Sequence, residues 1–334
     1  MKKMLIAVVG LLGLTAVAHA DSSGTGFGTG QSLDVKGFLS EARASKAPDA
    51  PIALAASAAE NPQASRPGQD VEWVTIDGGK FMMGDDKQSE ARPVHEVAIK
   101  TFEMSKTLVT VEQYKSCVIA GRCSRPRTEN NPTYTVTERR SFLGIRFNTY
   151  HEFARLGPYH DYCNWEKPGR ERHPINCVTW SQAREYADFI DLRFPGARLP
   201  NEAEWEYAAK SGGKDQPYPW GNEAPSCKRA VYDDCADGTM PVCSTPAGNT
   251  AQGLCDMAGN VKQYMQDRYQ SSYADAPTDG SALEMNNYSG ANRVVVRGGR
   301  YHYRHENLRA DSRNSELPDQ KPSGVGFRLA RDNR

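Results

Sequence analysis

The sequence predicts an irregular α+β fold that is rich in loops and held together by disulfides. Three features predict it. Strand-like segments of four or five residues are separated by glycine- and proline-containing turns, helix starts are few, and eight cysteines lie between Cys117 and Cys255. In an exported chain such cysteines are expected to form cross-links.

The first 20 residues predict export. Lys2 and Lys3 supply a short positive region, residues 5–17 form an apolar run, and Ala18-His19-Ala20 matches a cleavage site. This pattern is typical of a secretory signal peptide. The apolar run is shorter than the roughly 20 residues of a spanning helix. We therefore expect a periplasmic or secreted protein with no membrane insertion.

Composition and charge divide the remaining chain. Residues 21–69 are rich in Ala, Ser, Gly and Pro. They are expected to form a disordered tether, because such a segment buries too little apolar surface to order itself. Residues 70–334 are the predicted folded domain. The chain has 41 Lys and Arg against 41 Asp and Glu, so charge gives no reason to expect a nucleic-acid partner.

Three capping boxes predict helices in the folded domain. They begin at Thr110, Thr179 and Asn201, each followed three residues later by Gln or Glu; the two side chains bond reciprocally to free backbone N–H groups. The third helix places Trp205, Ala208 and Ala209 on one face for burial. The expected strands are residues 73–76, 80–83, 95–99 and 293–297.

The cysteines favour disulfides over a metal site. Eight cysteines allow 105 connectivities, so their number does not fix the pairing. A structural zinc site is the alternative, but the sequence contains no CxxC spacing, which zinc knuckles require.

A series of motifs from Phe81 onward resembles the formylglycine-generating-enzyme, or sulfatase-modifying-factor, family. In family order they are Phe81–Gly84, Pro93–Val97, Val109–Thr110 with Gln113–Tyr114, His173–Pro174 with Val178–Trp180, Arg198–Ala209, Tyr218–Gly221, Gly253–Val261, Arg297–Gly299 and Gly326–Ala330. The resemblance implies an irregular fold related to C-type lectins. Much of residues 124–172 lies outside the match and is expected to be an insertion.

Proximity and similar pairs in secreted members of the resembled family together favour a sequential disulfide pattern. The expected pairs are Cys117–Cys123, Cys163–Cys177, Cys227–Cys235 and Cys243–Cys255.

The enzyme resembled here uses a C-x4-C pair near its C-terminus to bind copper(I) and oxidise a substrate cysteine with oxygen. Counting back from Gly326–Arg328 places His305 and Ala310 at these two positions. An alanine neither ligates copper(I) nor exchanges with a thiol. We therefore identify no catalytic residue and expect neither copper nor formylglycine-generating activity.

Calcium is the one cofactor that the resemblance still suggests. The weak candidate ligands are Asn260, Val261 and Gln263, where Gln263 replaces the acid of the family's motif. Calcium affinity follows oxygen count and ligand charge, so this site is expected to be weakened. No other cofactor is expected.

The predicted binding surface comprises the loop from Arg300 to Arg309 and the turn from Ser312 to Ser323. Tyrosine and arginine recur as binding anchors on loops. The candidate residues are Arg300, Tyr301, His302, Tyr303, His305, Arg309 and Arg313. In the alternative interpretation, Tyr301 and Tyr303 pack under the loop, while Arg309 and Arg313 form internal ion pairs.

Three classes of function remain open. The first is an exported non-catalytic binding or assembly factor for an unidentified protein or small molecule. The second is a periplasmic oxidoreductase-type maturation enzyme with non-cysteine chemistry, like siderophore-maturation or iron-dependent members that the domain resembles. Such an enzyme would draw on His302, His305 and Glu306, joined by His151, His160 or His173. The third is a diversified ligand-binding receptor, because such proteins end in a similar segment.

Overall fold

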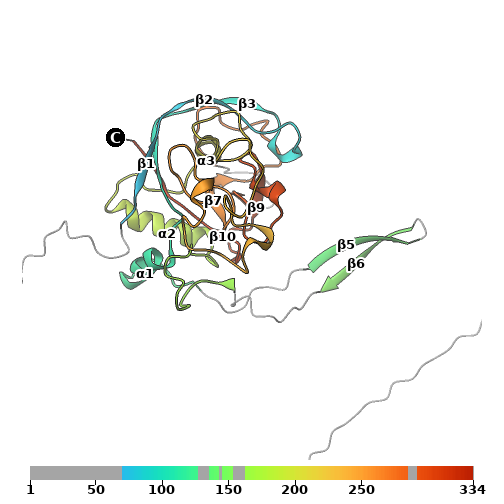
Figure 1. The fold of residues 1–334 in the computed structure, drawn as a ribbon, viewed down its shortest axis with the longest axis horizontal. Coiled ribbons are helices and arrows are strands. Elements are labelled where there is room, and N and C mark those ends of the chain that lie inside the picture. Colours follow the sequence, from blue (N-terminus) through green and yellow to red (C-terminus); the bar gives the residue numbers. More distant parts are fainter. Residues whose placement is uncertain (1–69, 127–134, 143–144, 153–161, 285–291, 334) are drawn as a thin grey trace, which may run out of the picture. The chain divides into compact units, whose positions relative to one another are not determined.

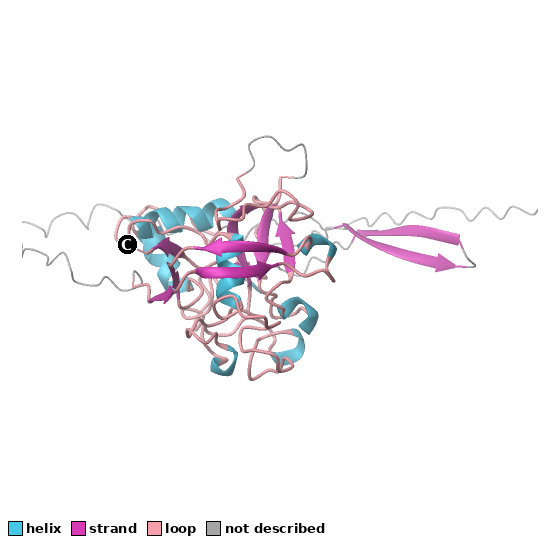
Figure 2. Cartoon of the chain, turned by 90° about the horizontal axis from the view of Figure 1, so that it is seen from above, coloured by secondary structure: helices cyan, strands magenta, loops and turns pink. Residues whose placement is uncertain are grey.

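A computed structural model describes residues 70–126, 135–142, 145–152, 162–284 and 292–333. The expected signal peptide, residues 1–20, and the expected tether, residues 21–69, lie outside the described residues. Much of the described part is loop, with short strands and few helices between (Figure 2). This confirms the predicted irregular α+β class.

The three predicted helix starts are confirmed. The helices are α1 (Val111–Ile119), α2 (Trp180–Asp191) and α3 (Glu202–Ala209), and a capping box opens each of them. At α1 the Gln113 N–H donates to Thr110 Oγ1 at 3.2 Å, and the Thr110 N–H donates to Gln113 Oε1 at 2.9 Å. These bonds satisfy N–H groups that have no partner within the helix.

Four sheets organise the strands (Figure 1). One contains β1 (Trp73–Ile76), β4 (Phe102–Ser105) and β11 (Ala330–Asp332); a second has the order β10 (Val325–Gly326), β7 (Lys262–Arg268), β8 (Val294–Arg297) and β9 (Arg313–Glu316). The pairs β2 (Gly79–Met83) with β3 (His95–Ile99) and β5 (Thr135–Phe142) with β6 (Ile145–Glu152) complete the set. Short 3-10 helices cover Ser89–Ala91, Asp233–Cys235, Pro246–Gly248 and His305–Leu308.

The four predicted strands are present as β1, β2, β3 and β8, but the region after β8 differs from the prediction. Residues 312–323 were expected to form a turn, and they include β9. Strand β9 forms because it pairs antiparallel with β8, with Val295 opposite Ser315. The predicted insertion, residues 124–172, contains the hairpin of β5 and β6.

Helix α3 is buried on every side, contrary to the prediction of one buried face. It contacts β2, β3 and β7 (Figure 1), and all eight of its residues are buried. Trp205 is fully buried, as predicted. Trp220 is half-buried and stacks on Tyr218 with ring centroids 5.1 Å apart.

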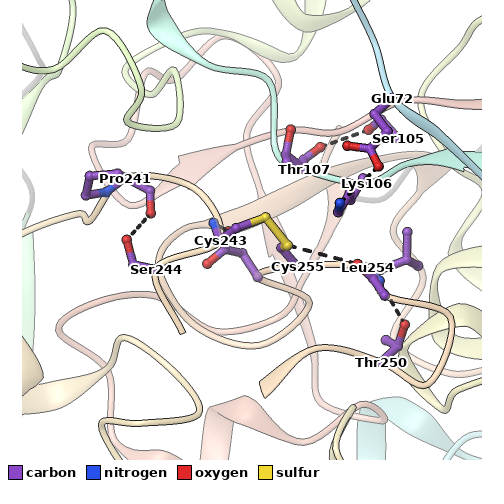
Figure 3. Close-up of a disulfide and its surroundings, with 12 residues drawn as sticks. Glu72, Ser105, Lys106, Thr107, Pro241, Cys243, Ser244, Thr250, Leu254 and Cys255 are labelled. Carbon is purple, nitrogen blue, oxygen red and sulfur yellow. Dashed lines mark hydrogen bonds and ion pairs between the residues drawn. A yellow bond between two sulfur atoms is a disulfide. The ribbon is translucent and has the colours of Figure 1, made fainter. Parts of the chain in front are cut away.

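All eight cysteines are joined in four disulfides. The bonds are Cys117–Cys123, Cys163–Cys177, Cys227–Cys235 and Cys243–Cys255, which are the pairs expected from the sequence. Figure 3 shows the last of them, beside which the Cys255 N–H donates to the Lys106 carbonyl at 2.9 Å. Closing such short loops contributes about 2–3 kcal/mol each by the chain-entropy estimate.

Within the described part of the chain, no helix has both the length and the apolar character needed to span a membrane.

Candidate functional site

The candidate site lies on the loop that follows β8. Gly298 and Gly299 turn the chain with φ values of +99° and +70°, which side chains rarely adopt. A Cβ on Gly298 would lie 3.1 Å from the Trp205 ring, and one on Gly299 would lie 2.8 Å from the Asn307 carbonyl. The two glycines therefore let the loop fold closely over the core.

A buried ion network fastens β8 to α3. The Arg297 guanidinium donates to Glu206, whose carboxylate also accepts from Lys210 Nζ at 2.8 Å and from the Gly84 N–H at 2.9 Å. Burial opposes ionisation of Glu206, but Lys210 and Arg297 outweigh it and hold the pKa of Glu206 below its usual value. The network makes the start of the loop part of the rigid core.

Arg313 belongs to this interior and not to a binding surface, so the structure matches the alternative interpretation, in which Arg313 forms an internal ion pair. Its Nε and NH2 groups donate to the two oxygens of Glu202 at 2.6 and 2.9 Å. Its guanidinium also lies 4.3 Å from the centre of the Tyr273 ring. Arg313 is 7% exposed, so a ligand at the surface does not reach its charged group.

Arg309 and Tyr301 also serve the internal structure. Arg309 makes two hydrogen bonds to the Asp311 carboxylate, at 2.8 and 2.6 Å. Tyr301 is 3% exposed, and its hydroxyl lies 3.5 Å from Ser323 Oγ. For these two residues the structure matches the alternative interpretation, in which the tyrosine packs under the loop and the arginine forms an internal ion pair.

The two positions of the family's catalytic cysteines lie in different surroundings. His305 is exposed at the start of the 3-10 helix. Ala310 is 1% exposed, and its N–H donates to the Pro217 carbonyl at 2.8 Å. Because every cysteine of the chain is in a disulfide, no thiol is available to replace the missing pair.

The remaining candidates form an aromatic and cationic surface cluster of Arg300, His302, Tyr303 and His305. His302 and His305 are exposed, while Arg300 and Tyr303 are half-buried. The Arg300 guanidinium lies 3.9 Å from the centre of the Tyr303 ring, and the His302 ring meets Tyr303 edge-on at 5.6 Å. Partial desolvation of the imidazole ring, together with the cations Arg300 and Lys262, lowers the pKa of His302 to about 4. His302 is therefore neutral at physiological pH and can accept as well as donate a hydrogen bond.

Lys262, which the sequence analysis did not predict as a site residue, lies beneath this surface cluster. It begins β7, is 2% exposed, and its Nζ lies 4.6 Å from the centre of the Tyr303 ring. Its Nζ donates to Asn314 Oδ1 at 3.1 Å. A signal was present in the sequence, because lysine stands where the resembled motif has an aromatic residue.

The side-chain oxygens of Asn260 and Gln263, two of the residues proposed for calcium, already have partners. Asn260 Oδ1 accepts from the Met240 N–H at 3.1 Å. Gln263 Oε1 accepts from Trp205 Nε1 at 2.8 Å and from Arg328 Nε at 2.6 Å. Val261 is fully buried. A guanidinium bound to Gln263 and the lack of a carboxylate in this set do not fit a calcium ion.

Of the histidines proposed for an iron site, His302 and His305 share the loop after β8. His173 is 6% exposed and lies 2.9 Å from Thr239 Oγ1, His151 lies in β6, and His160 falls outside the described residues. Within the described ranges no group of three or more His, Cys, Asp or Glu side chains is placed to hold a metal ion.

Comparison with known proteins relates residues 57–333 to the sulfatase-modifying factor enzyme 1-like domain. The formylglycine-generating enzyme of Streptomyces coelicolor is 31% identical over 323 residues, covering 83% of this chain and 94% of the enzyme. The inactive C-alpha-formylglycine-generating enzyme 2 of Bos taurus is 28% identical, with 79% and 89% covered. The serine/threonine-protein kinase pkn1 of Chlamydia caviae is 32% identical over 78% of this chain. The matched region spans only 38% of the kinase's own length.

Among solved structures, PvdO from Pseudomonas aeruginosa is similar in fold and sequence. It has a TM-score of 0.58 and 26% identity, and the match covers 81% of this chain and 100% of PvdO.

Proposed function

The chain belongs to the family of sulfatase-modifying factor enzyme 1-like domains, and from this premise we propose that it is an exported, non-catalytic member that acts as a binding or assembly factor. The observation that carries the proposal is the state of its cysteines. His305 and Ala310 replace the catalytic pair, and the four disulfides use every thiol in the chain. The family's copper-dependent thiol chemistry therefore has no residue to perform it.

The surface cluster of Arg300, His302, Tyr303 and His305 supports a binding role. These side chains offer a cation, an aromatic face and hydrogen-bonding nitrogens on a loop whose base is fixed in the core. A rigid scaffold that displays polar and aromatic loop residues is a common arrangement at binding sites. Family membership of an inactive relative in Bos taurus is consistent with use of this fold without the enzyme's chemistry.

Four disulfides support the exported location. Such bonds persist in oxidising compartments and are rare in the reducing cytosol. The proposed place of action is accordingly the periplasm or the cell exterior.

Two substitutions in the surface cluster test the binding role. We expect Tyr303→Ala and His305→Ala to remove partner capture, measured by cross-linking in the exporting host and mass spectrometry. Melting temperature and export should stay close to those of the wild type, because neither side chain is fully buried. Leu192→Ala, at a 67% exposed position after α2, is the control. Full capture by both variants, or loss of folded protein, would overturn the proposed role of the surface cluster.

A second candidate is an oxidoreductase-type maturation enzyme with non-cysteine chemistry, which is supported by similarity to the hercynine oxygenase of Mycolicibacterium smegmatis, 28% identical over 80% of this chain and 63% of that protein. In this case His302 and His305 would take part in proton transfer or metal binding. Metal analysis of the purified chain separates the candidates. Stoichiometric iron that is lost in a His302→Ala, His305→Ala variant would favour the enzyme over the binding factor.

A further inference from the structure

Lys262 is a buried cation without a buried anion. It is 2% exposed, and among the described residues no carboxylate lies within ion-pair distance of its Nζ. Its contacts are the Asn314 amide oxygen at 3.1 Å and the face of the Tyr303 ring. The ammonium group has three N–H donors, so this environment satisfies it only in part.

Lys210 is a second buried lysine, and its charge is paired with a carboxylate. It is 8% exposed, and its Nζ lies 2.8 Å from the Glu206 carboxylate. Removing a cation from water is unfavourable unless an anion and hydrogen bonds compensate for the loss. Lys210 has this compensation and Lys262 does not, so stability does not explain the presence of Lys262.

Arg300 adds a second cation at the same place. The Arg300 guanidinium lies 3.9 Å from the centre of the Tyr303 ring, which Lys262 also contacts. The Nε atom of Arg300 is buried and has no hydrogen-bond partner. The side chain lies against the backbone of Gly324, where a Cβ would be 2.2 Å from Arg300 Cδ. The Tyr303 ring thus contacts two cations, and among the described residues neither has a carboxylate within ion-pair distance.

We propose that Lys262 and Arg300 form a binding site for an anionic group, a carboxylate or a phosphate, of the ligand. This inference rests on the proposed binding function and names the chemistry of what is bound. The anion would accept hydrogen bonds from Lys262 Nζ and Arg300 Nε and would displace the Tyr303 ring, which is half-buried on the exposed loop. An arginine fork beside a lysine suits oxyanions with several acceptor oxygens.

The surrounding charges are consistent with such a site. Arg293 and Glu316 are the other charged groups that act on Lys262. Burial, opposed by Glu316 and reinforced by Arg300 and Arg293, lowers the pKa of Lys262 to about 8. A bound anion would favour the charged lysine, so binding should weaken as pH rises above this value.

The test uses the oxidised full chain with inorganic phosphate and with succinate, against sodium chloride at equal ionic strength. Calorimetry should show binding of at least one of the two anions to the wild type, and their comparison distinguishes phosphate from carboxylate recognition. Lys262→Met should weaken that binding at least tenfold. Without an anion it should raise the melting temperature by about 3 °C or more, because an uncompensated buried charge is removed.

Two further variants keep the test decisive. Gly324→Ala should weaken anion binding while all charges are retained, because the new methyl group displaces Arg300. Lys210→Met is the matched control and should lower the melting temperature, because it breaks a buried ion pair.

Absence of anion binding to the wild type, or equal binding by Lys262→Met and Gly324→Ala, would overturn the proposed site. Partner capture that needs Tyr303 but persists in Lys262→Met would overturn the anion site and leave the binding function standing. Loss of partner capture in both Tyr303→Ala and Lys262→Met would support the anion site as part of the binding function.

Discussion

Replacing Glu206 by glutamine is expected to lower the free energy of unfolding by about 3–5 kcal/mol, which is typical of a broken buried ion pair. Glu206 is fully buried between Lys210 and Arg297. Glutamine keeps the shape but removes the negative charge, and its amide N–H groups face the donors of one of the two cations. Chemical denaturation under oxidising conditions measures the loss.

Glu96→Gln is the matched control for this substitution. Glu96 pairs with Lys80 at 2.8 Å, but the two side chains are 58% and 68% exposed, and such surface pairs contribute about 0–1 kcal/mol. The folded pKa of Glu206 lies below its usual value. Its contribution is therefore present above that usual value and is lost as pH falls through the folded pKa. Equal, small effects of the two substitutions would contradict the role of the network.

Gly248→Ala is expected to destabilise the protein by about 3 kcal/mol or more, at or above the upper end of overpacking effects. Gly248 ends the 3-10 helix at residues 246–248, inside the loop closed by Cys243 and Cys255. A Cβ at this position would lie 1.6 Å from the carbonyl oxygen of Arg229. Because that atom belongs to the backbone, one of the two loops has to move. Thermal and denaturant unfolding report the change.

Gly238→Ala separates this clash from the general effect of replacing a glycine. A Cβ on Gly238 would meet nothing within 4 Å, so alanine there is expected to be neutral or to stabilise the protein by up to about 1 kcal/mol. If Gly248→Ala changed the free energy of unfolding as little as Gly238→Ala, this would contradict the close approach of Gly248 to the Arg229 carbonyl.

Local signals in the sequence were sufficient for most of the framework. The helix starts at Thr110, Thr179 and Asn201 were predictable because a capping box involves residues only three positions apart. The strands from β1 to β3 follow similar short-range patterns. The disulfides were predictable in pairing because each closes a short loop and because resembled proteins carry similar pairs.

Long-range pairing explains what the sequence did not predict. Strand β7 contains the polar residues Lys262, Gln263 and Asp267, and all three are buried. Their partners are far away in sequence: the Gln263 side chain, for example, bonds to Arg328. In α3, Glu204 closes the capping box, whereas Glu202 pairs with Arg313, more than 100 residues later.

The candidate site was therefore predicted only in part. Arg300, Tyr303 and His305 were recognised by their chemistry and lie at the surface, whereas Arg313 shows the same chemistry and lies in the core. No local pattern distinguishes an arginine that binds a ligand from one that binds a buried glutamate. The exchange of an aromatic residue for Lys262 is visible in the sequence, but the burial of Lys262 is not, because it depends on β10 and on the loop after β8.

The measurement that tests the central claim most directly is an assay for formylglycine formation in a sulfatase-type peptide. The purified, oxidised chain is incubated with the peptide, oxygen and copper(I), and the peptide mass is followed, with the Streptomyces coelicolor enzyme as positive control. We expect no conversion by this chain under conditions in which the control reacts to completion, because His305 and Ala310 replace the cysteine pair and no free thiol remains. Conversion of the peptide that depends on the chain would contradict the account of a family member with the fold and without the chemistry.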